Sequence, residues 1–403
     1  MAKTGKTKER EASSVRNIFA LGFVSFFTDI SSEMVFSILP TFLLGLPGSS
    51  VAVLGFIEGT AEALSYALRA VSGIFSDKFR KRKIFVLAGY AISNAVKPFF
   101  AVARVPFDVL VIRVADRVGK AVRTSPRDAL LVDSVSEKRR GAAFGLHRTL
   151  DQAGAIIGPL IASAVMIGFG FAFRDIFWLS LIPGAIALFI LLFLVKERAS
   201  GTVGGFRLLD GIRSALVGNF RWLLVVVGIF SLGAFNFSFV LLYAQQAGVA
   251  GSVIPLVYAL VNGVHALIAI PAGLLSDRFG KEKMMVFGFC VFLGACVLLL
   301  FPVNMVAAFL LATVFGGYLG IVETVQRALV PQYVQPSLRG TAYGLYYLFV
   351  GCAFFVSNAV FGSLWDVFGS SVASVYSIVL SAVAIVAMVL FVKKTSKPVL
   401  QQI

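Results

Sequence analysis

The chain has 403 residues, of which 58% are hydrophobic and only 14% are charged, and its mean hydropathy is +0.90. Soluble domains are roughly 45–50% apolar and about 25% charged, so this composition excludes an ordinary soluble protein and indicates a chain embedded in a bilayer. The formal net charge of +16 would suggest nucleic acid on a soluble domain, but membrane topology explains it here and we expect no nucleic-acid partner.

Apolar stretches long enough to cross a hydrocarbon core, about 17–25 residues each, recur along the whole chain. We predict them near residues 18–46, 51–75, 84–103, 107–130, 141–168 and 176–195, and again near 220–247, 252–275, 284–302, 305–333, 340–363 and 371–392. The runs are too long and too uniformly apolar for barrel strands, so we expect an all-α integral membrane protein with twelve transmembrane helices.

Lys and Arg gather in alternate connecting segments, as the positive-inside rule describes for cytoplasmic loops. The basic segments include residues 3–16, 78–83, 127–140, 196–221, 278–283 and 393–397, whereas the opposite loops hold only Arg104 and Arg174. This pattern predicts that both termini are cytoplasmic. Residues 1–16 lack a cleavage site after a short apolar core, so we expect a cytosolic tail and not a cleaved signal.

Ionisable side chains inside membrane spans are rare and costly, so each is a candidate functional group. In the first span Asp29 and Glu33 are spaced i,i+4 and share a face. Such a carboxylate pair suits a proton carrier, although either residue is equally compatible with a static pair to a neighbouring arginine. In the second span Glu58 and Glu62 form a stripe with Arg69, which suits either cation or proton binding or simple charge compensation.

The fourth span carries the longest charged stripe in the chain. It consists of Arg113, Asp116, Lys120, Arg123 and Arg127, at i, i+3, i+7, i+10 and i+14. Because this stripe lies in a membrane span, we expect it to face a water-filled cavity or charged partners.

The fifth span combines small residues with a bend. These positions are Gly145, Gly154, Gly158 and Pro159. Small residues let helices approach closely and proline bends them, so the pattern suits either a role in sealing the two halves or generic close packing. Asp151 and His147 lie at its cytoplasmic end, where a gate, a proton relay and a structural network are all compatible with them.

The second half is less charged inside its spans. His265 suits either contact with substrate or proton, or a hydrogen bond within the bundle, and Glu323 is spaced to pair with Arg327. The chain has only two histidines and no Ser-His-Asp or metal-ligand spacing. We therefore expect no enzyme activity, no metal and no cofactor, with coupling chemistry concentrated in the first half.

Two blocks recur about 200 residues apart. Residues 73–83 match residues 273–283, and residues 140–146 match 339–345. The repeat predicts a six-plus-six duplication with a substrate site near the midplane. The predicted divisions are a cytosolic N-terminal tail at 1–16, a six-helix bundle at 17–195, a cytoplasmic linker at 196–218, a second six-helix bundle at 219–392 and a cytosolic C-terminal tail at 393–403.

The repeated loop carries a family resemblance. Its pattern, Gly-x-x-x-Asp-Arg/Lys-x-Gly-Arg/Lys-x-Arg/Lys, resembles the signature of the major facilitator superfamily, and the resemblance covers nearly the whole chain. It implies two conformational latch loops, with Gly73, Asp77 and Lys78 in the first copy and Gly273, Asp277 and Arg278 in the second. The first copy departs from the pattern at Arg80, where the family has glycine.

Three further segments extend the resemblance. Residues 113–121 are similar to the family's helix-4 motif, which implies proton coupling through Arg113. Residues 145–163 resemble the antiporter motif of drug exporters, which implies efflux. Residues 26–34 resemble uncharacterised prokaryotic members, which implies a prokaryotic plasma or inner membrane and names no substrate.

These observations predict a secondary transporter that moves a small molecule by proton-coupled efflux, with the proton gradient as driving force and the lipid bilayer as its surroundings. We expect a monomer. The basic groups of spans three to five, including Lys97, suit an organic-anion or phosphorylated-metabolite transporter as an alternative, either importer or facilitator. A membrane enzyme or a receptor without transport is the alternative from another class.

Overall fold

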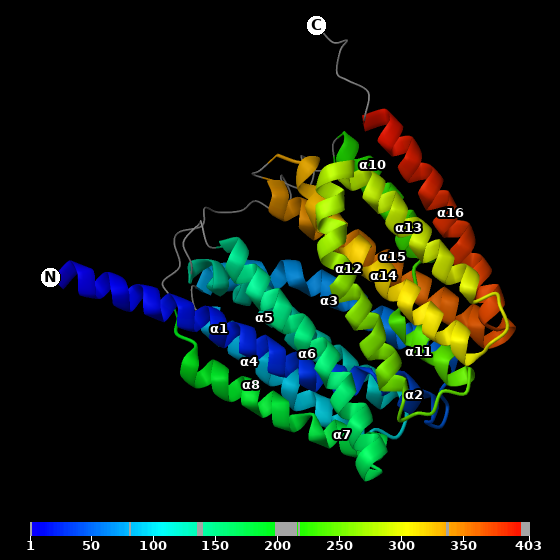
Figure 1. Cartoon of the computed structure of the whole chain (residues 1–403), viewed down its shortest axis with the longest axis horizontal. Coiled ribbons are helices and arrows are strands. Elements are labelled where there is room, and N and C mark those ends of the chain that lie inside the picture. The colour runs from blue at the N-terminus through cyan, green and yellow to red at the C-terminus, as the bar shows by residue number, and fades with distance from the viewer. Residues whose placement is uncertain are drawn as a thin grey trace, which may run out of the picture. The chain divides into compact units, whose positions relative to one another are not determined.

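The structure is a computed structural model that describes the backbone of residues 2–79, 82–134, 140–197, 216, 218–335 and 338–395. All regular elements within these ranges are helices (Figure 1). The side chains of residues 2–15, 69–79, 133, 140–142, 327, 339 and 395 lie outside the described part.

The first half of the chain forms helices that correspond to the six predicted spans. They are α1 (Ala2–Phe36), α2 (Leu39–Leu44), α3 (Val51–Phe79), α4 (Arg82–Val96), the 3₁₀ helix η1 (Lys97–Val102), α5 (Pro106–Asp133), α6 (Arg140–Phe169), α7 (Phe173–Leu179) and α8 (Leu181–Leu194). The change from α4 to η1 coincides with Pro98, because proline lacks an N–H and disfavours the α conformation of the residue before it.

The second half repeats this arrangement. Its helices are α10 (Asn219–Gly233), α11 (Phe237–Gln246), α12 (Ile254–Phe279), α13 (Lys281–Leu298), α14 (Met305–Leu329), η3 (Val330–Gln332), α15 (Arg339–Phe368) and α16 (Ser370–Thr395). The break between α10 and α11 ends at Asn236, whose side chain accepts a hydrogen bond from the Ser238 N–H at 2.9 Å and caps α11. Each predicted span therefore corresponds to one helix or to consecutive helices.

Ten helical stretches of the described residues are long and apolar enough to cross a membrane. The other two predicted spans are α5 and α13, with 28 and 18 residues. α5 carries the charged stripe, and α13 begins with Lys281, Glu282 and Lys283. At 1.5 Å per residue α13 is about 27 Å long, close to the thickness of a hydrocarbon core. Charge, not length, separates these two helices from the other ten.

The chain folds into two compact units. The first comprises Met1–Gly48, Leu64–Gly204 and Gly251–Ala259, and the second comprises Ser49–Ala63, Gly205–Ala250 and Leu260–Ile403. Most of the predicted linker at 196–218 lies outside the described residues. The division into bundles at 17–195 and 219–392 stays a prediction.

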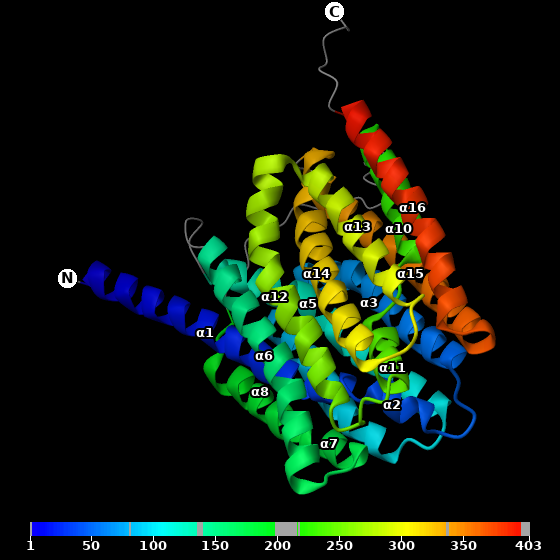
Figure 2. The same ribbon diagram turned by 45° about the vertical axis from the view of Figure 1, so that its right-hand side comes forward.

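In the first unit, helices cross at glycines. α1 lies beside α6 and α8 (Figure 1; Figure 2), and α4 packs on α5. At the α4–α5 crossing, a Cβ added to Gly89 would lie 2.6 Å from the carbonyl oxygen of Gly119, and one added to Gly119 would lie 2.8 Å from that of Gly89. Only glycine permits this approach, which brings the charged face of α5 against α4.

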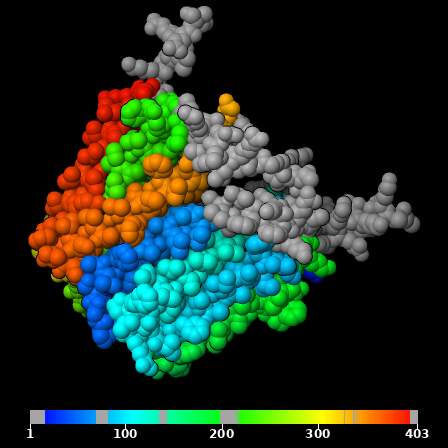
Figure 3. All heavy atoms as spheres, turned by 180° about the vertical axis from the view of Figure 1, so that it is seen from behind, coloured from blue at the N-terminus to red at the C-terminus, as the bar shows by residue number. Residues whose placement is uncertain are grey.

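The second unit has an aromatic core. Phe230 of α10 stacks on Phe289 of α13 with ring centroids 3.8 Å apart, and Phe235 stacks on Phe361 of α15 at 4.5 Å. All four rings are at most 3% exposed. α10 (green) and α16 (red) lie next to each other on the face drawn in Figure 3. These aromatic side chains pack the helices of the second unit against one another.

Candidate functional site

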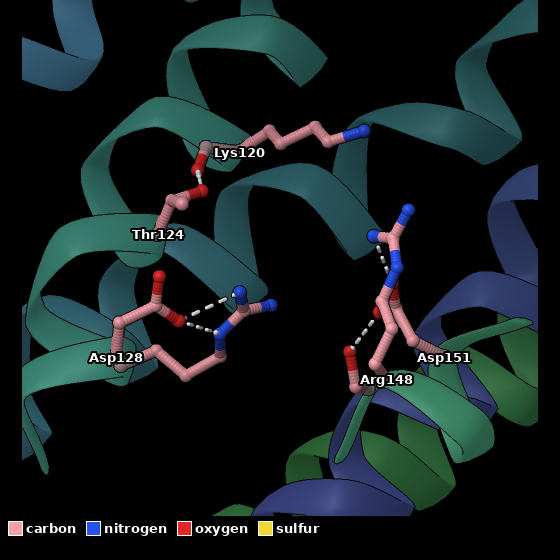
Figure 4. Close-up of polar contacts among 7 residues, drawn as sticks. Lys120, Thr124, Asp128, Arg148 and Asp151 are labelled. Carbon is pink, nitrogen blue, oxygen red and sulfur yellow. Dashed lines mark hydrogen bonds and ion pairs between the residues drawn. The ribbon is translucent and has the colours of Figure 1, made fainter. Parts of the chain in front are cut away.

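A pair of carboxyl groups joins α1 to α6 in the first unit. Asp29 on α1 and Asp151 on α6 form a side-chain hydrogen bond with each other. Ser25 Oγ donates to Asp151 Oδ1 at 2.6 Å, and Arg148 Nη1 lies 3.3 Å from Asp151 Oδ2. Figure 4 shows Arg148 and Asp151 side by side on α6. The carboxyl group that Asp29 contacts is therefore that of Asp151 on another helix. The sequence had suggested only Glu33, on the same helix.

The glycine spacing of α6 makes this contact close. A Cβ added to Gly154 would meet the carbonyl oxygen of Phe26 and would lie 3.1 Å from Cβ of Asp29. A Cβ added to Gly158 would lie 2.7 Å from the carbonyl oxygen of Ile30. Gly145 has nothing within 4 Å of the same position. The two glycines therefore pack α6 on α1, which favours the close-packing interpretation of this motif.

What the Asp29–Asp151 pair can do chemically depends on which carboxyl group can donate a hydrogen bond. An ionised carboxylate only accepts hydrogen bonds, and a carboxyl group donates one only when it is protonated. Two carboxyl groups that bond to each other therefore hold one proton between them, which the protonated member donates. Two ionised carboxylates at this separation would repel each other. A pair of this kind suits the binding of a proton inside a membrane span, and this role stays a prediction.

Glu33 lies one turn beyond Asp29 and has a different partner. Tyr258 Oη donates to Glu33 Oε2 at 2.7 Å. Within the described part of the chain, neither Asp29 nor Glu33 forms an ion pair with an arginine, although charged groups of α5 act on Glu33 electrostatically. Tyr258 carried no signal in the sequence, because a tyrosine in an apolar span is ordinary.

The stripe on α5 is distributed over several neighbours. Arg113 Nη1 lies 3.9 Å from Asp116 Oδ2, and the Arg113 guanidinium lies 3.9 Å from the ring centroid of Phe36 on α1. Ser93 Oγ of α4 donates to Asp116 Oδ1 at 2.6 Å. Arg113 is 0% exposed and Asp116 is 2% exposed. These two members of the stripe therefore pack between helices.

The remaining members have local partners. Arg123 lies 4.1 Å from the ring centroid of Tyr90 on α4, and Arg127 pairs with Asp128 at 2.8 Å. Figure 4 shows the Asp128 pair and the extended side chain of Lys120, which leaves α5 on the side where Arg148 and Asp151 are drawn. Lys120 also acts electrostatically on Asp29 and on Glu33.

Lys97 is a buried amine that links three elements of the first unit. It is 0% exposed, and its Nζ donates to Ser32 Oγ of α1 at 3.0 Å and to Asn94 Oδ1 of α4 at 2.8 Å. Both partners are neutral, and no carboxylate of the described residues lies within ion-pair distance of Lys97. The sequence identified Lys97 as a basic residue within a span, but it did not predict the hydrogen bond to Ser32 of α1.

Four of the predicted site residues belong to the second unit. Glu58 is 2% and His265 is 7% exposed, and both belong to the second unit together with Glu62 and Glu323. A Cβ added to Gly320 of α14 would lie 2.8 Å from the carbonyl oxygen of His265. The side chain of Arg327, the predicted partner of Glu323, lies outside the described part. Functional roles for these residues stay predictions.

The two latch loops differ in what the structure describes. Gly73, Asp77 and Lys78 lie on α3, and their side chains are outside the described part. In the second copy Lys281 Nζ lies 4.0 Å from Asp277 Oδ1, whose side chain is 74% exposed. Arg278 lies 5.4 Å from the ring centroid of Phe279, and Gly273 faces Thr324. An exposed pair of this kind contributes little stability, and the latch role stays a prediction.

Known proteins resemble the chain along most of its length. Residues 21–263 and 221–402 match the model of the Major Facilitator Superfamily. An uncharacterised MFS-type transporter of Methanocaldococcus jannaschii is 30% identical over 368 residues, which are 90% of this chain and 92% of that protein. Multidrug resistance protein MdtG of Proteus mirabilis is 26% identical over 359 residues, or 83% and 85% of the two chains.

Solved structures agree at the level of the fold. The crystal structure of a mutant of the nucleoside transporter NupG superposes with a TM-score of 0.79 and covers 93% of this chain and 99% of its own. The sequence identity is 12%, so this likeness concerns the fold alone.

Proposed function

The chain belongs to the major facilitator superfamily, and from this premise we propose that it exports a small molecule in exchange for protons. Members of this family are transporters and not enzymes, so the chain is a multi-pass membrane transporter. Proton coupling and efflux are the proposed part. The observation that carries them is the hydrogen-bonded pair of Asp29 and Asp151.

The pair supports proton coupling because its proton is held between two helices. Release of that proton leaves two negative charges in contact inside a membrane span, which is unfavourable unless the surroundings change. The protonated and the deprotonated pair therefore differ in energy, and this difference can drive a change of conformation in a transporter. Similarity to the multidrug resistance protein MdtG supports the direction of export.

The remaining expectations belong to the same proposal. The protein alternates access by movement of two six-helix bundles, at 17–195 and 219–392, around a site near the midplane. It works as a monomer in a prokaryotic plasma or inner membrane with both termini in the cytoplasm.

A second candidate is an organic-anion or phosphorylated-metabolite transporter. Lys97 supports it, since this amine is 0% exposed and its hydrogen-bond partners among the described residues, Ser32 and Asn94, are neutral. In its protonated form, an amine in such surroundings attracts an anionic group strongly, because the local dielectric constant is low. This candidate leaves the direction of transport open.

The test is transport in liposomes that contain a trapped pH dye. Cationic drugs and organic anions are added in parallel to wild type, Asp29→Asn, Asp151→Asn and Arg113→Ala. Asp175→Asn is the matched control, because Asp175 is an exposed carboxylate at the start of α7. We expect substrate-evoked proton movement in wild type and in the control, and its loss in Asp29→Asn and Asp151→Asn.

The responding compounds identify the charge of the substrate. If labelled substrate moves down its gradient without proton movement, and both aspartate variants transport it as wild type does, proton coupling through this pair is wrong. A response to anions alone, lost in Lys97→Met, would favour the second candidate.

A further inference from the structure

The beginning of α12 is attached to the first unit, whereas the rest of this helix belongs to the second. Residues 251–259 are grouped with α1, α6 and α7, and the boundary falls between Ala259 and Leu260. Ser163 Oγ of α6 donates to the carbonyl oxygen of Ser252 at 2.6 Å. A Cβ added to Gly251 would lie 3.0 Å from Cζ of Phe173 on α7. One helix therefore takes part in both compact units.

The hydrogen bond of Tyr258 differs from the other contacts of this segment because its acceptor is ionisable. Tyr258 is 6% exposed, and its hydroxyl donates to Glu33 at 2.7 Å. The bond of Ser163 joins a hydroxyl to a backbone carbonyl and does not change with pH. A hydrogen bond to an ionised carboxylate is roughly twice as strong as one between neutral groups. Of these contacts, the hydrogen bond of Tyr258 is the one whose strength depends on the charge of Glu33.

Charged groups from several elements act on Glu33. Arg113, Arg117 and Lys120 of α5 interact electrostatically with it. Lys97 of η1 interacts electrostatically with Glu33 as well.

Asp29, on the same helix, opposes ionisation of Glu33 when it is itself ionised, because like charges repel. In the proposed function, Asp29 shares a proton with Asp151, with which it interacts. Loss of that proton places a negative charge one turn from Glu33 and favours protonation of Glu33. The two proton sites are therefore coupled through α1.

We propose that Tyr258 is a positioning residue that couples protonation of Glu33 to the attachment of residues 251–259 to the first unit. When Glu33 is ionised, the Tyr258 hydroxyl holds the beginning of α12 against α1. When Glu33 takes up a proton, the bond weakens and this segment detaches more often. The assignment rests on the proposed function, in which carboxyl groups of α1 carry protons.

Hydrogen–deuterium exchange of the purified full-length protein tests this role with protons as the only probe. Protection of residues 251–259 is followed from about pH 8 to about pH 5, and each rate is corrected with an unstructured peptide in the same sample. In wild type we expect protection of this segment to fall as the pH falls. In Tyr258→Phe and in Glu33→Gln it should be low at every pH, because neither variant forms the charge-assisted bond.

Tyr376→Phe is the matched control. The Tyr376 hydroxyl donates to the carbonyl oxygen of Leu232 at 2.6 Å in the second unit, so its removal deletes a tyrosine hydroxyl hydrogen bond with a neutral acceptor. This variant should keep the wild-type pH dependence at residues 251–259. If Tyr258→Phe folds poorly, Glu33→Gln carries the test with the tyrosine intact.

Wild-type pH dependence retained in Tyr258→Phe or in Glu33→Gln would overturn the role of Tyr258, and so would protection that does not change with pH in wild type. The exchange measurement needs neither a substrate nor a proton gradient. Absence of proton flux in liposomes together with pH-dependent protection would therefore overturn the proposed function alone. Intact proton flux with pH-independent protection would overturn the role of Tyr258 alone.

Discussion

Asp116 illustrates how single residues carry charge inside the first unit. Its side chain is 2% exposed, accepts a hydrogen bond from Ser93 and lies 3.9 Å from Arg113. A buried carboxylate is tolerated when hydrogen bonds and a nearby cation offset its loss of hydration. Among the described residues, Asp29 forms no ion pair with an arginine, and it contacts the carboxyl group of Asp151. This contrast is the reason why we propose Asp29, and not Asp116, as the site of the exchanged proton.

The hydrogen bond from Ser93 to Asp116 gives a quantitative test of this difference. Ser93→Ala should reduce the free energy of unfolding by about 1.5–3 kcal/mol if the acceptor is charged. In an Asp116→Asn background the same substitution should cost only about 0.5–1.5 kcal/mol, because the bond is then between neutral groups. Denaturant titration of the four proteins in mixed micelles measures both values. Equal costs in the two backgrounds would show that Asp116 is not ionised in the folded protein.

At the scale of elements, pairs of glycines spaced four residues apart determine which helices touch. Gly154 and Gly158 place α6 on α1, and Gly316 and Gly320 place α14 on α12. α3 meets α15 in the same way within the second unit, through Gly55 and Gly59. Without a Cβ the backbones approach closely, and dispersion contacts replace the hydrophobic effect that lipid cannot supply.

The α1–α6 crossing yields a prediction within one motif. Gly154→Ala should lower the free energy of unfolding by about 1–3 kcal/mol, because its methyl group has no room against Phe26 and Asp29. Gly145→Ala should be neutral or stabilise by up to about 1 kcal/mol, since the site is open and alanine favours helices. Thermal unfolding in detergent compares the two. Equal stability of both variants, with transport lost only in Gly154→Ala, would favour a direct role of this glycine in transport.

At the scale of the whole molecule, each half of the sequence contributes one short segment to the compact unit formed mainly by the other half. Residues 49–63, with the beginning of α3, belong to the second unit, and residues 251–259, with the beginning of α12, belong to the first. The two segments lie about 200 residues apart, at matching positions of the repeat. Asp366 of α15 accepts a hydrogen bond from the Val51 N–H at 3.0 Å and so caps α3 within the second unit. Compact units therefore do not coincide with the two halves of the sequence.

The orientation of the molecule in the membrane can be tested independently of transport. We expect a protease-cleavable tag at the C-terminus to be cut in inside-out vesicles and protected in intact cells, because the basic segments place both termini in the cytoplasm. A tag inserted between α6 and α7, next to Phe171, should give the reverse result. Cleavage of the C-terminal tag in intact cells would show that the charge distribution does not set the orientation.

The sequence by itself determined the class of protein, the twelve spans and the family. Span length and apolar composition are local properties, so they could be read without any tertiary contact. The sequence also identified Asp29, Glu33 and Asp151 as candidates, because any ionisable residue in a span is unusual.

Only the tertiary structure decided which of these residues meet. Asp29 bonds to Asp151 of α6, and Glu33 to Tyr258, which is 225 positions away. Helical periodicity predicts a shared face but not the helix that this face contacts. That choice depends on where small residues let two backbones cross, and on segments such as 251–259 that pack outside their own half of the sequence.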